Sequence, residues 1–116
     1  MADKDQIGLT TAGSAVMDRL LGRGYFSGKD EAAKFAAALA MERGMVAEPV
    51  RGATTTWNAR TLDATGELKT AILLLYDHPE PYRALEGLMD AGLQLLGDHM
   101  TERGDLVLSE LLTPSD

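Results

Sequence analysis

The side chains best suited to chemistry in this 116-residue chain are its two histidines, because the sequence contains no cysteine. His99 and Glu102 are three residues apart and would share one face of a helix, where they could hold a metal ion together. A structural zinc ion needs four ligands, and no further ligands stand at a matching spacing. His78, beside Asp77 and close to Glu80, fits a polar junction between two helices. We therefore expect neither a metal site nor a cofactor.

The known sequence motifs of catalysis do not occur in this chain. A nucleophile elbow has the pattern Gly-x-Ser-x-Gly, which the segment Ala12-Gly13-Ser14-Ala15 does not match. The glycines at positions 22, 24 and 28 lack the spacing of a dinucleotide-binding loop and follow a predicted helix rather than a strand. The adjacent acids Asp30 and Glu31 stand where a helix begins. Acidic side chains are favoured at that position because they interact favourably with the positive end of the helix dipole. We expect that the protein is not an enzyme.

The composition is that of an ordinary globular domain, with 45% apolar and 25% charged residues. Residues 1–44 carry as many basic as acidic side chains, whereas residues 45–116 carry the whole net charge of −7. The N-terminus is polar and lacks the apolar run of a signal peptide. The longest apolar run, Ala71–Tyr76, is far too short to cross a membrane. We expect a cytoplasmic protein without membrane contact.

The elements that must position any functional side chain begin with an alternating segment at residues 5–10. Ile7 and Leu9 would lie on one face of a short strand, and Gln6, Gly8 and Thr10 on the other. Thr10, or the threonine that follows it, can cap the next helix. The pattern predicts a half-buried strand followed by a helix.

The rest of the chain predicts a mainly α fold, with the short N-terminal strand followed by about five helices in one domain over residues 1–116. The expected helices are Thr11–Arg23, Asp30–Arg43, Glu67–Tyr76, Pro81–Gly104 and Asp105–Leu112. Residues 67–112 would form a helical acidic half. Glu67–Tyr76 is expected to be a buried helix, although a strand is possible for so apolar a run. Residues 45–66 are expected to be a long loop, in which Thr54–Trp57 favours a short extended piece.

The strand-helix-helix order of residues 5–44 resembles a ribbon-helix-helix unit, the DNA-binding module of many small bacterial and phage repressors and antitoxins. In that family the strands of two chains form an antiparallel ribbon that enters the major groove, and the helices build the dimer core. The resemblance implies a DNA-binding homodimer whose groove-facing residues are Gln6, Gly8 and Thr10, with Lys4 just before them. It also implies that amides near Ser27, Gly28 and Lys29 hold a backbone phosphate.

Two main hypotheses of function follow. The first is a small regulatory DNA-binding protein of ribbon-helix-helix type that acts as a homodimer. A lone strand exposes unpaired backbone groups, which favours strand pairing between two chains. The alternative is an acidic helical module that binds another protein through residues 45–66 and the C-terminal helices, without binding DNA. In that case Trp57 could anchor the partner. The favoured alternative for Trp57 is a place in the core or in a dimer interface, because most tryptophans are largely buried. An accessory subunit of an enzyme is a third possibility.

Overall fold

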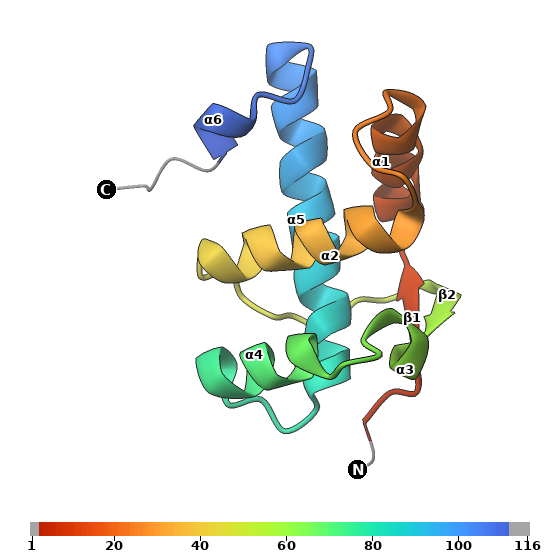
Figure 1. Cartoon of the computed structure of the whole chain (residues 1–116), viewed down its shortest axis with the longest axis vertical. Helices are drawn as coiled ribbons and strands as arrows, with labels where there is room; N and C mark the ends of the chain where they lie inside the picture. The colour runs from red at the N-terminus through yellow and green to blue at the C-terminus, as the bar shows by residue number, and fades with distance from the viewer. Residues whose placement is uncertain (1–2, 112–116) are drawn as a thin grey trace.

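A computed structural model describes residues 3–111, in which helices pack around one long central helix and a two-stranded sheet lies at one side (Figure 1). The prediction of a mainly helical fold is confirmed, and the described residues form one compact globule. The elements are β1 (Gln6–Leu9), α1 (Thr11–Gly22), α2 (Lys29–Glu42), β2 (Thr54–Asn58), α3 (Ala59–Leu62), α4 (Glu67–Tyr76), α5 (Pro81–Arg103) and α6 (Leu108–Leu111).

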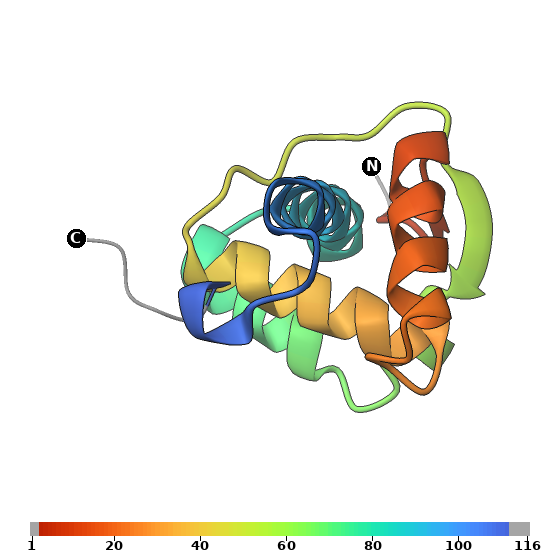
Figure 2. The ribbon, with the colours of Figure 1, turned by 90° about the horizontal axis from the view of Figure 1, so that it is seen from above.

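Helix α5 is the centre of the core, and α2 crosses it at close range (Figures 1 and 2). The buried face of α2 consists mostly of alanine, so its backbone can approach a neighbouring helix closely. On α5 the matching position is Gly92, where a methyl group would overlap the carbonyl oxygen of Ala36. Small residues on both helices therefore set the distance between them. Leu88, Leu93 and Leu96 of α5 are fully buried beside this crossing.

The ends of the long helices follow the capping rules. The Thr10 hydroxyl accepts a hydrogen bond from the Gly13 amide and so caps α1. Pro81 opens α5, and Gly104 ends it in a left-handed conformation that suits glycine. Between α1 and α2, the ring of Phe26 packs against Phe35 with 5.4 Å between the ring centroids. The expected boundaries of these three helices agree with the structure to within one residue.

The sheet differs from the expectation, because β1 pairs with a strand of the same chain. β1 and β2 are antiparallel, with Ile7 opposite Trp57 and Gly8 opposite Thr55, and the register shifts between Ile7 and Gly8. Residues 45–66, expected to be a loop, contain both β2 and the short helix α3. Periodicity within each strand cannot reveal that two segments almost fifty residues apart will pair. The homodimer itself stays a prediction.

Helix α4 also differs from the expectation. The helix forms where the sequence predicts it, but the prediction that it is buried is wrong for most of its apolar residues. Only Ile72 is buried, whereas Leu73, Leu74 and Leu75 are 43%, 80% and 64% exposed. The reason is that α4 lies at the edge of the molecule and packs on α5 with one side only (Figure 1).

The C-terminal arm folds back over the end of the core. Helix α6 begins at Leu108, three residues later than expected, and the expected end at Leu112 lies outside the described residues. The Arg43 guanidinium donates to the Leu111 carbonyl and thereby fixes the arm to the end of α2. Within residues 3–111, no helix combines the length and apolar character that crossing a bilayer requires.

Candidate functional site

Within residues 3–111 two acidic side chains are buried, and both hold the fold together. Glu86 on α5 is 2% exposed and reaches the N-terminal segment. One of its oxygens accepts from Lys4 Nζ at 2.7 Å, and the other accepts from the Gly8 amide at 2.9 Å. Both oxygens are engaged with the chain's own donors. Glu86 is therefore a structural residue that ties β1 and the segment before it to the central helix.

Asp63 is the second buried acid and caps α4. Its oxygens accept from the amides of Leu68 and Lys69, both at 3.0 Å, and from the Tyr82 hydroxyl at 3.1 Å. Burial raises the pKa of Tyr82, and the hydrogen bond that its hydroxyl donates to Asp63 raises that pKa further. Burial also raises the pKa of Tyr76, whose hydroxyl donates to the Met45 carbonyl. Each tyrosine is a hydrogen-bond donor that joins its helix to a connecting segment.

The two histidines accept backbone hydrogen bonds at helix junctions. His99 Nε2 accepts from the Val107 amide at 2.9 Å, and His78 Nδ1 accepts from the Glu80 amide at 3.0 Å. Each contact occupies one of the two ring nitrogens of its histidine. Across residues 3–111 there is no group of three or more histidine, aspartate or glutamate side chains placed to hold a metal. The His99–Glu102 pair considered from the sequence has no third ligand there.

The three residues expected to face a DNA groove, and the lysine just before them, have different environments. Gln6 is exposed, and its amide oxygen accepts from the Thr55 hydroxyl at 3.4 Å. Gly8 is buried rather than outward-facing, because β2 passes so closely that a methyl group there would lie 2.5 Å from the Thr54 carbonyl oxygen. The Thr10 hydroxyl donates to Asp90. Lys4 is half-buried and forms an ion pair with Glu86.

The residues expected to hold a phosphate lie at the start of α2. Gly28 is the N-cap residue, and no described side chain caps this helix. The Ser27 hydroxyl donates to Glu31, and the Lys29 side chain is exposed. Lys29 lines one shallow hollow beside the sheet together with Thr10, Thr54 and Thr56. A second hollow contains Lys4, Asp5, Gln6 and Thr55. Four of the expected DNA-binding residues thus line two separate hollows, whereas Gly8, Ser27 and Gly28 line neither. The role of all seven in DNA binding stays a prediction.

Trp57 is half-buried and packs against the core from its place in β2. Its cross-strand neighbour is Ile7, which is fully buried. This position agrees with the core-filling alternative for its role. Its expected role as a partner anchor stays a prediction.

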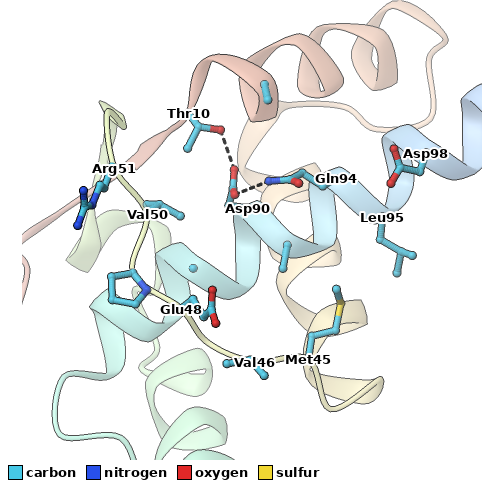
Figure 3. A pocket seen from close by; sticks show the side chains of 14 residues that line it. Thr10, Met45, Val46, Glu48, Val50, Arg51, Asp90, Gln94, Leu95 and Asp98 are labelled. Carbon is cyan, nitrogen blue, oxygen red and sulfur yellow. Dashed lines mark hydrogen bonds between the residues drawn. The ribbon is translucent and has the colours of Figure 1, made fainter.

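A hollow with a volume of about 690 Å³ lies between α5 and the segment 45–51. Figure 3 shows Met45 and Val46 on the segment, with Leu95 and Asp98 on the helix opposite. Asp90 is fixed within the hollow. It accepts from the Thr10 hydroxyl and from the Gln94 amide, each at 2.7 Å (Figure 3). The hollow combines apolar walls with carboxylates.

The most unusual surface feature is what we call the leucine face, formed by Leu73, Leu74 and Leu75 of α4. Single exposed apolar residues are ordinary, but three consecutive leucines on one short helix are not. Val46 is a further exposed apolar residue. It follows Met45, whose carbonyl oxygen accepts a hydrogen bond from the Tyr76 hydroxyl at the end of α4. The sequence contained a signal that periodicity alone misses. Four consecutive apolar residues at about 100° per residue surround most of a helix, so a one-sided contact cannot bury them all.

Neither a protein-family model, nor a curated protein, nor a solved structure matches this chain.

Proposed function

We propose that this protein is an acidic interaction module that binds another protein through the leucine face of α4. The observation that carries this proposal is the 80% exposure of Leu74 between two leucines that are also exposed. Burying a leucine side chain contributes about 1.5–3 kcal/mol. A helix that is apolar on most sides is normally covered on most sides, and here only the Ile72 side is covered. A partner surface would supply the missing contact.

The charges on α4 favour a different protein over a second copy as the occupant of this face. Exposed acids stand at both ends of the helix, Glu67 at its start and Asp77 just after its end. If two copies of α4 packed together, acid would meet acid in either the parallel or the antiparallel arrangement. Lys69 does not relieve this, because its ammonium group lies 6.0 Å from the Tyr82 ring centroid, on the side of α5. Two chains of charge −7 would also repel each other.

The chemistry of the expected partner follows from this arrangement. The complement of the leucine face is an apolar groove, and the complement of Glu67 and Asp77 is a basic rim at each end of that groove. Helix-in-groove recognition of this kind is a common way for proteins to bind. Charge complementarity at the rim would speed association and exclude partners of the wrong sign.

Site-specific photo-crosslinking tests the proposal. A benzophenone amino acid is placed at Leu74, and a matched control places it at Ala38, an exposed position on α2. The expected result, in cells that naturally produce the protein, is a crosslink from position 74 to a different protein. Mass spectrometry should locate it in a segment rich in apolar and basic residues. Equal crosslinking from both positions, or a crosslink mainly to a second copy of the chain, would contradict the proposal.

A further inference from the structure

The hollow of Figure 3 contains none of the three leucines of the leucine face. Its floor is formed by the outer side of α5, and its wall by the segment 45–51. The segment is fixed there by close packing. A methyl group at Gly87 of α5 would overlap the carbonyl oxygen of Glu48. The hollow is therefore held open by the fold, and its volume of about 690 Å³ falls within the range of ordinary ligand pockets.

The lining of the hollow combines apolar and negative groups. Met45, Val46, Val50, Ala91 and Leu95 supply apolar surface. Glu48, Asp90 and Asp98 supply three carboxylates, whereas Arg51 is the only basic residue in the lining. A nucleic acid or another polyanion would be repelled by this surface. A ligand that fits must be apolar on one side and positively charged on another.

The carboxylates are arranged along the helix axis. Asp90 and Asp98 are eight residues apart on α5, which places their backbones about 12 Å from each other. The Asp90 carboxylate is held in position by Thr10 and Gln94, so it requires little ordering when a cation approaches. Basic residues two helical turns apart on a partner helix would match this separation. Apolar residues between them would then face Leu95 and Val50.

We propose that the hollow between α5 and the segment 45–51 binds a basic amphipathic helical segment of a partner protein. The proposal depends on the hollow alone and does not require the leucine face to bind anything. The two ideas can therefore fail separately.

Fluorescence anisotropy with a defined peptide tests the proposal. The probe is a labelled 18-residue peptide of leucine and lysine, arranged so that the leucines form one helical face. The control peptide has the same composition in an order that is not amphipathic. The expected result, at about 150 mM salt, is saturable binding of the probe at least tenfold tighter than binding of the control. Equal affinity for both peptides, or no binding of the probe, would overturn the proposal.

Matched variants locate the binding site. D98K changes the charge at the hollow, and E102K makes the same change one turn further along α5 at an exposed position outside the hollow. D98K should weaken binding about fivefold or more, whereas E102K should change it less than twofold. A91R, which fills the hollow with a cation, should abolish binding, whereas A38R on α2 should not. Circular dichroism checks that each variant is folded.

The leucine-face variant L74K separates this proposal from the proposed function. It should leave peptide affinity unchanged. Loss of binding in L74K but not in D98K would place the peptide on α4 and overturn the assignment to the hollow. Equal weakening of peptide binding by D98K and E102K would show that the net charge alone attracts the peptide. That result would also overturn the assignment to the hollow.

Discussion

Glu86 is the residue on which the attachment of the N-terminal segment depends. It accepts from Lys4 Nζ and from the buried Gly8 amide. We expect E86A to lower the free energy of unfolding by about 3 kcal/mol, because it leaves that amide without an acceptor and Lys4 without its partner. Urea unfolding followed by circular dichroism measures the effect. D98A, at an exposed acid of the same helix, should change stability by less than about 0.5 kcal/mol. Similar losses in both variants would mean that Glu86 contributes no more than a surface carboxylate.

Tyr82 gives a prediction about pH. Its pKa is raised in the folded protein by burial and by donation to Asp63, so folding favours its neutral form. This contribution to stability is fully present below about pH 10 and is lost as the pH rises through the raised pKa. We expect Y82F to be about 1 kcal/mol less stable than the wild type at pH 8, through loss of the hydrogen bond. The difference in the free energy of unfolding between Y82F and the wild type should narrow above pH 10. If urea unfolding gives the same difference at pH 8 and at pH 11, the hydrogen bond from Tyr82 to Asp63 does not have this stabilising role.

Some residues could be assigned from the sequence and others could not. Alternation placed Ile7 and Leu9 in the core, and capping chemistry identified Thr10 as a candidate cap of α1. The same alternation placed Gly8 on the outer face. This prediction was wrong, because the backbone of β2 packs directly against Gly8 and buries it. The burial of Glu86 was unpredictable for a similar reason. Its partners are about eighty residues away, and an isolated acid on a helix normally faces solvent.

At the level of elements, the crossing of α2 over α5 depends on Gly92. A methyl group there would overlap the Ala36 carbonyl oxygen, so G92A should force the helices apart. We expect a loss of about 2–3 kcal/mol in the free energy of unfolding. G22A is the matched control, because a methyl group at Gly22 near the end of α1 meets no described atom within 4 Å. That variant should gain about 0.5–1 kcal/mol. A G92A protein as stable as the wild type would show that the helices do not touch there.

The leucine face makes a second prediction at this scale, concerning the isolated protein. L74K replaces an 80% exposed side chain near the C-terminal end of a helix, where a positive charge is favourable. It should change the free energy of unfolding by less than about 0.5 kcal/mol. I72A, which truncates the buried residue of the same helix, should lower that free energy by about 2–5 kcal/mol. A large loss in L74K would show that the face is packed within the monomer and is not free for a partner.

The helices were largely predictable as elements, and their contacts were not. Glycines, prolines and helical spacing fixed the boundaries of α1, α2 and α5 to within one residue. The pairing of β1 with β2 is a long-range contact that no local pattern encodes. The exposure of α4 escaped prediction because an apolar run looks the same whether the chain itself or a partner covers it. The hollow beside α5 depends on where the segment 45–51 packs, which is also a tertiary property.

On the scale of the whole molecule, the chain is as compact as a folded domain. The radius of gyration of 13.5 Å is close to the value of about 13 Å expected for a folded chain of this length. The leucine face lies at the edge of this compact structure. It is an apolar surface on an otherwise acidic molecule, and the net charge of −7 selects against anionic partners. These properties together favour association with a protein that offers an apolar groove and a basic rim.

Isothermal titration calorimetry with the crosslinked partner, purified, tests the central claim most directly. The wild type should bind with a negative change in heat capacity, the sign of apolar burial. L74K should weaken binding more than about tenfold, because it removes a buried leucine and places a cation against a basic rim. The matched variant A38K on α2 should bind as the wild type does. If L74K and A38K bind equally well, the leucine face is not the interaction surface and the account is contradicted.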